Sequence, residues 1–119
     1  MNFSKNEYKA RLKKVQSYMQ DKGIELLISQ DTANMNYLTG YDAWSFYYAQ
    51  AVVVHVNAEE PLCWVRKQDS GGAYIKTYLK SENILVYGEK YIHTWPLHPY
   101  DDLVEIIKEK KWDKLTIGL

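Results

Sequence analysis

Residues 46–57 read FYYAQAVVVHVN and carry the longest strand signal in the chain. Alternate residues of a strand point to opposite faces of its sheet, and both alternating sets are apolar here. A strand with two apolar faces is typical of the interior of a sheet that is covered on each side. The stretch therefore predicts a central strand, with helices packed against both faces of its sheet.

The residues around this strand predict its neighbours. After a turn at AEEP (58–61), the run LCWVRK (62–67) predicts an antiparallel return strand. Other short apolar runs predict strands at IELLIS (24–29), ILVYG (84–88) and KLTIGL (114–119).

Residues 3–23 predict a long first helix. Ser4 and Glu7 have the spacing of a capping box, Phe3 is placed to pack against Tyr8, and Gly23 is a C-terminal stop. One face is apolar and the other is rich in lysine, and the spacing predicts that the apolar face packs on the sheet. This face comprises Tyr8, Leu12, Val15 and Met19.

Three further helices are expected. Asp31 or Thr32 caps a short helix that ends at Gly40, and Asp69 or Ser70 caps a helix through Leu79. The stretch 89–102 reads as irregular and leads into a final helix with Leu103, Ile106 and Ile107 on one face. The order of elements predicts a single α/β domain over residues 1–119, with a mixed β-sheet flanked by helices.

Composition excludes several classes of protein. Fifteen Lys and Arg balance fifteen Asp and Glu, which argues against a nucleic-acid partner. No apolar run is long enough to span a bilayer, and the N-terminus lacks a secretory signal, so we expect no membrane partner. The single cysteine, Cys63, cannot form an internal disulfide. Together these features predict a cytoplasmic protein.

The residues show no standard catalytic motif. The DSGG stretch at 69–72 lacks the ending of a phosphate-binding loop. His55, His93 and His98 have no metal-ligand spacing: His55 is expected to be a hydrogen-bonded structural residue, and the other two a surface pair. Cys63 reads as a core residue. Asp31, Asp42 and Asp69 stand where caps or turns would place them.

An aromatic cluster occupies residues 34–50 and has two interpretations. Tyr37 and Tyr41 could pack the short helix onto the sheet. Alternatively, Phe46, Tyr48 and Gln50 share one face of the strand near Gly40, where they could form a platform for a ligand or a second subunit. Spacing alone leaves both interpretations open.

Three stretches carry a resemblance to a known family. NMNYLTGYDAWSFYYAQAVVV (34–54), RKQDSGGAYIKTYL (66–79) and ENILVYG (82–88) resemble the N-terminal domain of creatinase and its relatives, the Xaa-Pro peptidases and ectoine hydrolase. The resemblance covers nearly the whole chain. YLTGYDAWSFY (37–47) together with QDSGGA (68–73) is most similar to the ectoine hydrolase and creatinase branch.

The resemblance implies a ribonuclease-H-like topology and a two-domain enzyme. The second, "pita-bread" catalytic domain is absent from these residues, so we expect no cofactor in this chain. In the peptidases that domain holds divalent metal, such as manganese, cobalt or zinc, whereas creatinase works without metal. The family's N-terminal domain takes part in dimerisation and lends residues to the neighbouring subunit's active site.

The resemblance also implies site residues. Phe46 matches a substrate-contacting Phe of creatinase, but Tyr48 stands where creatinase has an Arg. Because a Tyr hydroxyl supplies neither a charge nor a bidentate fork, this difference argues against creatine as the substrate. The expected substrate-binding residues are Trp44, Phe46, Tyr48 and Gln50.

The first hypothesis is therefore the substrate-gating and dimerisation domain of a C–N hydrolase, either an Xaa-Pro peptidase or a creatinase-like or ectoine-hydrolase-like enzyme. Its partners would be its own C-terminal catalytic domain, a second identical subunit and a small-molecule substrate. The isolated domain would be inactive. The alternative is a stand-alone module that binds a small molecule or a protein and lacks a catalytic partner domain.

Overall fold

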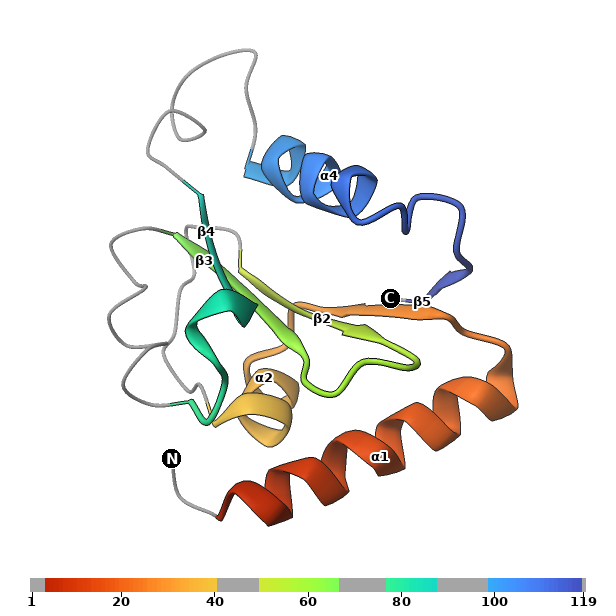
Figure 1. Cartoon of the computed structure of the whole chain (residues 1–119), viewed down its shortest axis with the longest axis vertical. Coiled ribbons are helices and arrows are strands. Elements are labelled where there is room, and N and C mark those ends of the chain that lie inside the picture. Colours follow the sequence, from red (N-terminus) through yellow and green to blue (C-terminus); the bar gives the residue numbers. More distant parts are fainter. Residues whose placement is uncertain (1–3, 41–49, 67–76, 88–98, 119) are drawn as a thin grey trace.

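The computed structural model describes residues 4–40, 50–66, 77–87 and 99–118, and these form a five-stranded sheet with helices on both faces (Figure 1). The strand order is β4-β3-β2-β1-β5, and the sheet is mixed. β2 pairs antiparallel with β1 and β3, whereas β3–β4 and β1–β5 are parallel. The predicted central strand and its antiparallel return are confirmed, but β2 begins at Ala51, so Gln50, which was predicted to lie within the strand, directly precedes it. The strands are β1 (Leu26–Ser29), β2 (Ala51–His55), β3 (Leu62–Arg66), β4 (Ile84–Tyr87) and β5 (Ile117–Gly118).

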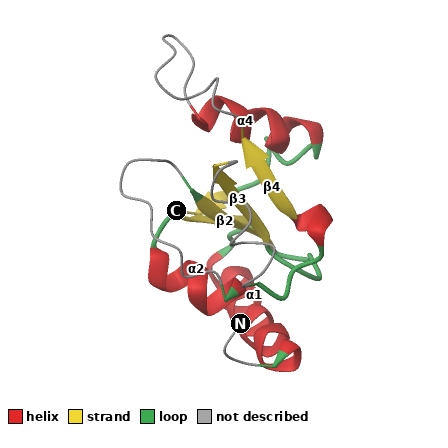
Figure 2. Cartoon of the chain, turned by 90° about the vertical axis from the view of Figure 1, so that its left-hand side faces the viewer, coloured by secondary structure: helices red, strands yellow, loops and turns green. Residues whose placement is uncertain are grey.

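The two faces of the sheet are covered by different helices, as the side view in Figure 2 shows. Val52 and Val54 of β2 belong to the cluster that packs against α1 (Lys5–Lys22) and α2 (Thr32–Thr39). Ala51 and Val53 belong to the cluster that packs against α4 (Pro99–Glu109). β2 therefore has no solvent-facing side, as its doubly apolar sequence predicts.

The first helix follows its sequence signals closely. Ser4 Oγ accepts a hydrogen bond from the Glu7 amide at 3.2 Å, which confirms the N-cap. At the other end Gly23 has φ 71°, and its N–H bonds the Gln20 carbonyl while the Ile24 N–H bonds the Met19 carbonyl. This pair of bonds is a Schellman motif. The predicted apolar face is confirmed, with Tyr8, Leu12 and Met19 buried and Val15 packed against them. Phe3 lies outside the described residues.

The other helix ends identify the capping residues. Asp31 Oδ1 accepts a hydrogen bond from the Asn34 amide at 3.3 Å, so Asp31 is the side chain that caps α2. Gly40, with φ 86°, follows the last residue of that helix, as predicted. In α4 Leu103 and Ile107 are buried. The irregular stretch expected through residue 102 is wrong in its last four residues: Pro99 begins the helix, because the first helical position needs no amide donor.

The helix predicted to run through Leu79 is wrong at its C-terminal end. Thr77, Tyr78 and Leu79 are not helical, and the last two join the core on the α1 side, where the Tyr78 ring stacks on Tyr8 with centroids 5.0 Å apart. A single 3-10 turn, η2 (Ser81–Asn83), then leads into β4. Asp69 and the rest of that predicted helix lie outside the described residues. Burial of these two consecutive side chains outweighs the local helical pattern.

Gly23 gives a test of the backbone at the end of α1. Gly23→Ala should lower the free energy of unfolding by about 1–2 kcal/mol, because a side chain disfavours the left-handed conformation. A Cβ at this position would meet nothing within 4 Å, so the loss would come from backbone conformation alone. Urea unfolding measures the change.

Gly23→Asn is the matched control, because asparagine tolerates the left-handed region better than alanine and should recover part of the loss. Equal stability of the alanine variant and the parent would contradict this account of the helix end.

Candidate functional site

Several strand ends meet at one edge of the sheet. β1, β3 and β4 run in the same direction, so their carboxyl ends lie together, and β2 begins at the same edge. We call it the carboxyl edge and define it by the backbone at Ser29, Gln50, Arg66 and Tyr87. In open α/β sheets, ligands bind outside the carboxyl ends of the strands. Topology thus makes this edge the first candidate for a functional site.

Of the predicted substrate-binding residues, Gln50 is the one that the structure describes. It directly precedes β2 at the carboxyl edge and is 6% exposed. Trp44, Phe46 and Tyr48 lie outside the described residues and stay predictions. The segment that contains them is bounded by Gly40 and Gln50. A buried amide at this edge can donate and accept hydrogen bonds, which suits it to fixing the orientation of a polar ligand.

Tyr37 does not have its predicted role of packing α2 onto the sheet. Met35 and Leu38, which are fully or almost fully buried, do that instead. The Tyr37 ring is 39% exposed and lies against Arg11 of α1, with the guanidinium carbon 4.7 Å from the ring centroid. Arg11 Nη1 also donates to the Tyr37 carbonyl at 3.1 Å, which places a cation at the C-terminal turn of α2. Tyr41 lies outside the described residues.

A group of three packed, mutually tilted aromatic rings on the α4 face was missed by sequence reasoning. The Trp64 ring lies 4.7 Å from Tyr87 and 5.2 Å from Tyr100, and its Nε1 donates to Asp102 Oδ2 at 2.9 Å. Burial raises the pKa of Tyr100. The Asp102 carboxylate is in the first turn of α4, where negative charge is favourable. This group of rings joins the N-terminus of α4 to β3 and to the carboxyl end of β4. A tryptophan in a buried strand predicts that its indole N–H has a hydrogen-bond acceptor. The sequence contains many possible acceptors and does not specify which one is used.

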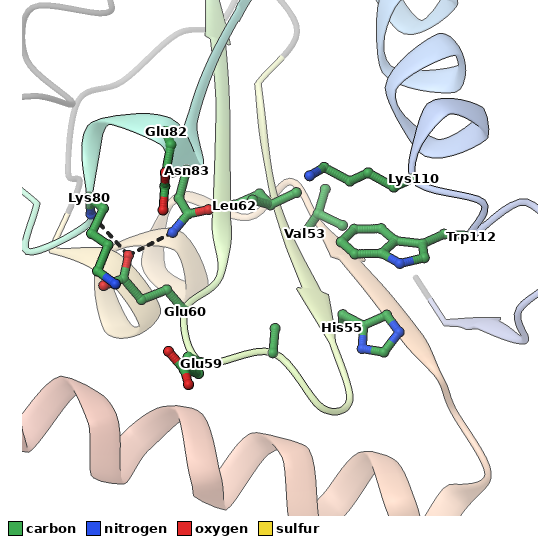
Figure 3. A pocket seen from close by; sticks show the side chains of 11 residues that line it. Val53, His55, Glu59, Glu60, Leu62, Lys80, Glu82, Asn83, Lys110 and Trp112 are labelled. Atoms are coloured by element: carbon green, nitrogen blue, oxygen red, sulfur yellow. Dashed lines mark hydrogen bonds between the residues drawn. The ribbon is translucent and has the colours of Figure 1, made fainter.

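A cavity of about 290 Å³ opens at the opposite edge of the sheet (Figure 3). The 8%-exposed Glu60 lines it, and its Oε1 accepts hydrogen bonds from the Lys80 amide and from Asn83 Nδ2, both at 2.9 Å. These bonds hold η2 against the turn between β2 and β3. The sequence motif AEEP showed only a turn, so this role of Glu60 was not foreseen. Its bonds to backbone and amide groups give Glu60 a structural role.

His55 lines the same cavity and is hydrogen-bonded, as predicted. Its Nδ1 accepts from the Asn57 amide at 3.1 Å, and its ring lies 4.9 Å from Trp112. His93 and His98, together with Asp42 and Asp69, lie outside the described residues. Within the described ranges, no group of three or more His, Cys, Asp or Glu side chains is placed to hold a metal ion. No helix in the same ranges is both long and apolar enough to cross a bilayer.

Cys63 is a core residue, as predicted. Its side chain is fully buried in β3, and burial raises the pKa of the thiol to about 12. Because the thiolate is the nucleophilic form, this cysteine is unsuited to catalysis near neutral pH.

Comparison with known proteins defines the family. The Creatinase/Prolidase N-terminal domain matches residues 11–119, and the chain belongs to this family. It is 36% identical to ectoine hydrolase of Halomonas elongata over 118 residues, which are 98% of this chain and 29% of the relative. It is 35% identical to the protein named hydrolase/peptidase y4tM of Sinorhizobium fredii over 119 residues, which are 100% of this chain and 30% of the relative. The chain thus spans less than a third of the length of either relative.

Solved structures share the fold. The Creatinase/Prolidase N-terminal domain of an X-Pro dipeptidase from Streptococcus pyogenes superposes with a TM-score of 0.67 at 20% identity, covering 82% of this chain and 67% of that one. Dipeptidase PepE from Mycobacterium ulcerans superposes with a TM-score of 0.69 at 15% identity, covering 91% of this chain and 28% of that one. The expected α/β fold of a creatinase N-terminal domain is confirmed.

The two adjacent glutamates of the β2–β3 turn test the role of Glu60. Glu60→Ala should lower the free energy of unfolding by about 2–3 kcal/mol, because it leaves a backbone amide and a side-chain amide without their charged acceptor. Glu59→Ala, at an exposed position, should stay within about 0.5 kcal/mol of the parent. Urea unfolding of both variants measures the difference. Equal effects would show that Glu60 does not organise η2.

Thiol labelling tests the burial of Cys63. At pH 8 the folded chain should react very slowly with 5,5′-dithiobis(2-nitrobenzoate), because the raised pKa keeps the thiol protonated and the core excludes the reagent. The same chain in about 6 M guanidinium should react fully, since the unfolded thiol has an ordinary pKa. Rapid labelling of the folded chain would contradict the buried position.

Proposed function

We propose that this chain is the N-terminal domain of a two-domain C–N hydrolase and has no activity on its own. The observation that carries the proposal is the match to ectoine hydrolase, which covers 98% of this chain but 29% of the relative. Most of that enzyme therefore corresponds to residues beyond this match. A catalytic domain that holds manganese, cobalt or zinc, or works without metal, would supply the chemistry.

The role proposed for this domain is to form one wall of the substrate pocket. Topology supports the carboxyl edge as that wall, because three strands end there and β2 begins there with the buried Gln50. Trp44, Phe46 and Tyr48 would complete it: aromatic rings with polar edges can cover a substrate and still hydrogen-bond to it. Association of two such subunits in a homodimer is part of the same proposal.

Ectoine is the first substrate to test. The match to ectoine hydrolase is 36% identical over almost the whole chain, whereas the solved X-Pro dipeptidase domain from Streptococcus pyogenes is 20% identical. Xaa-Pro dipeptides are the second class to test.

The experiment begins with the genomic DNA beyond the codon for Leu119. If the reading frame continues, the full-length protein should hydrolyse ectoine or Xaa-Pro dipeptides, with or without added manganese, and the 119-residue chain should hydrolyse neither. Turnover by the purified chain, with contaminating peptidases excluded, would contradict the proposal. A stop codon directly after Leu119 would favour the stand-alone module instead.

Variants of the full-length protein test the pocket wall. Trp44→Ala and Tyr48→Phe should each lower kcat/KM by about tenfold or more, because each removes a contact or a hydrogen bond to the substrate. Val104→Ala, at an exposed position on α4, is the matched control and should retain full activity. Unchanged kcat/KM in both site variants would show that the aromatic cluster serves packing alone.

A further inference from the structure

A groove of about 430 Å³ lies between α1 and α2, on the face of the sheet that these helices cover. Val15 and Tyr18 of α1 form one wall, Tyr37 and Leu38 of α2 form the other, and Leu27 of β1 lies between them. Its volume falls within the range of about 300–1,000 Å³ that is usual for small-molecule sites. It shares no lining residue with the cavity of Figure 3.

The groove gathers exposed aromatic surface. Tyr18 is 61% exposed and Tyr37 39% exposed, and they are two of the four large hydrophobic side chains that the described residues expose. Burying such rings away from water is favourable in free energy, and both rings lie beside the same groove. Exposed apolar side chains that gather around a concave surface are typical of a binding site.

The charged residue that lines the groove is a cation. Of the described residues that line the groove, Lys14 is the charged one. Among the residues that the structure describes, Lys14 forms no ion pair. The two aromatic walls also carry cations, because the Arg11 guanidinium carbon lies 4.7 Å from the Tyr37 ring centroid and Lys22 Nζ lies 5.7 Å from that of Tyr18. Glu7, the acidic neighbour of Arg11, is paired with it at 3.4 Å.

Helical spacing explains why these cations share one side. Arg11, Lys14, Tyr18 and Lys22 follow one another at intervals of three or four residues, so they form a single stripe along α1. Ser29 and Asn34 add a hydroxyl and an amide from β1 and α2, both able to donate hydrogen bonds. Lys14 gives the groove a cation while its walls stay apolar, which complements an anion with an apolar body.

We propose that this groove binds a small aromatic carboxylate. The ring of the ligand lies between Tyr18 and Tyr37 above Leu27, and its carboxylate is held by Lys14. Such binding is non-covalent and adds a ligand site to the proposed hydrolase domain. A helix of a partner protein or a second copy of this chain would bring apolar side chains but does not need the unpaired Lys14, so the carboxylate is the occupant that the charges favour.

Two nearly isosteric probes test the charge requirement. Isothermal titration calorimetry of the 119-residue chain with 2-naphthoate should show saturable binding to one site, and neutral 2-naphthamide should bind about tenfold more weakly. Lys14→Gln should remove the preference for the anion. Lys13→Gln is the matched control, because Lys13 is an exposed neighbour on α1 that does not line the groove.

The aromatic wall is tested separately. Tyr18→Ala should weaken binding of both probes by about tenfold, while the unfolding midpoint stays close to that of the parent because the ring is largely exposed. Full-length protein should bind 2-naphthoate as the chain does, and this readout is independent of hydrolase activity.

Four outcomes would overturn the proposal. The first is no saturable binding of 2-naphthoate up to about 5 mM. The second is an anion preference that survives Lys14→Gln or is lost equally in Lys13→Gln. The third is binding by the chain that the full-length protein does not reproduce, because the groove would then be an interface with the rest of the enzyme. The fourth is a dimer in analytical ultracentrifugation that Tyr18→Ala dissociates, which would assign the groove to a second copy.

Discussion

The burial of β2 on both faces is the constraint on which the rest of the structure depends. Val52 and Val54 need a cover of apolar side chains on one face, and Ala51 and Val53 need one on the other. Burial of a valine is worth about 1.5–3 kcal/mol, so leaving either face open would expose several such side chains to water. α1 with α2 covers one face and α4 the other. β1 and β3 occupy the two hydrogen-bonding edges of β2 and so place it inside the sheet.

Polar ties then set the positions of the covering elements. Gln16 Nε2 donates to the His55 and Ala58 carbonyls and so joins α1 to the β2–β3 turn. Trp64 and Asp102 connect β3 with the first turn of α4, and Arg11 connects α1 with the last turn of α2. The bonds of Gln16 and Trp64 are partly screened from water, so breaking one of them would leave a desolvated polar group without its partner. Apolar burial decides which faces meet, and these ties decide the orientation.

Two regions of the molecule acquire functional meaning from this arrangement. The carboxyl edge, with Gln50 buried beside it, follows from the strand directions and agrees with membership of the creatinase and prolidase N-terminal domain family. The groove between α1 and α2 is lined by residues of both helices and of β1, and Tyr18 and Tyr37 are exposed beside it. The first concerns the proposed enzyme's substrate, and the second offers a place for a different, anionic ligand.

For the cap of α2 the sequence left Asp31 and Thr32 as alternatives, and the structure selects Asp31. Local sequence was sufficient for other features that depend on neighbours along the chain: the α1 cap at Ser4, its stop at Gly23 and the doubly buried strand. These are governed by nearby backbone groups and by the period of apolar residues. Gln50 was predicted to lie inside the strand but directly precedes β2, whereas the arrangement of Trp44, Phe46 and Tyr48 stays a prediction. The contacts of Glu60, Trp64 and Tyr37 were beyond sequence patterns. Each joins residues 20 or more positions apart, and no local spacing specifies which of many available partners a long-range fold will bring within hydrogen-bonding distance.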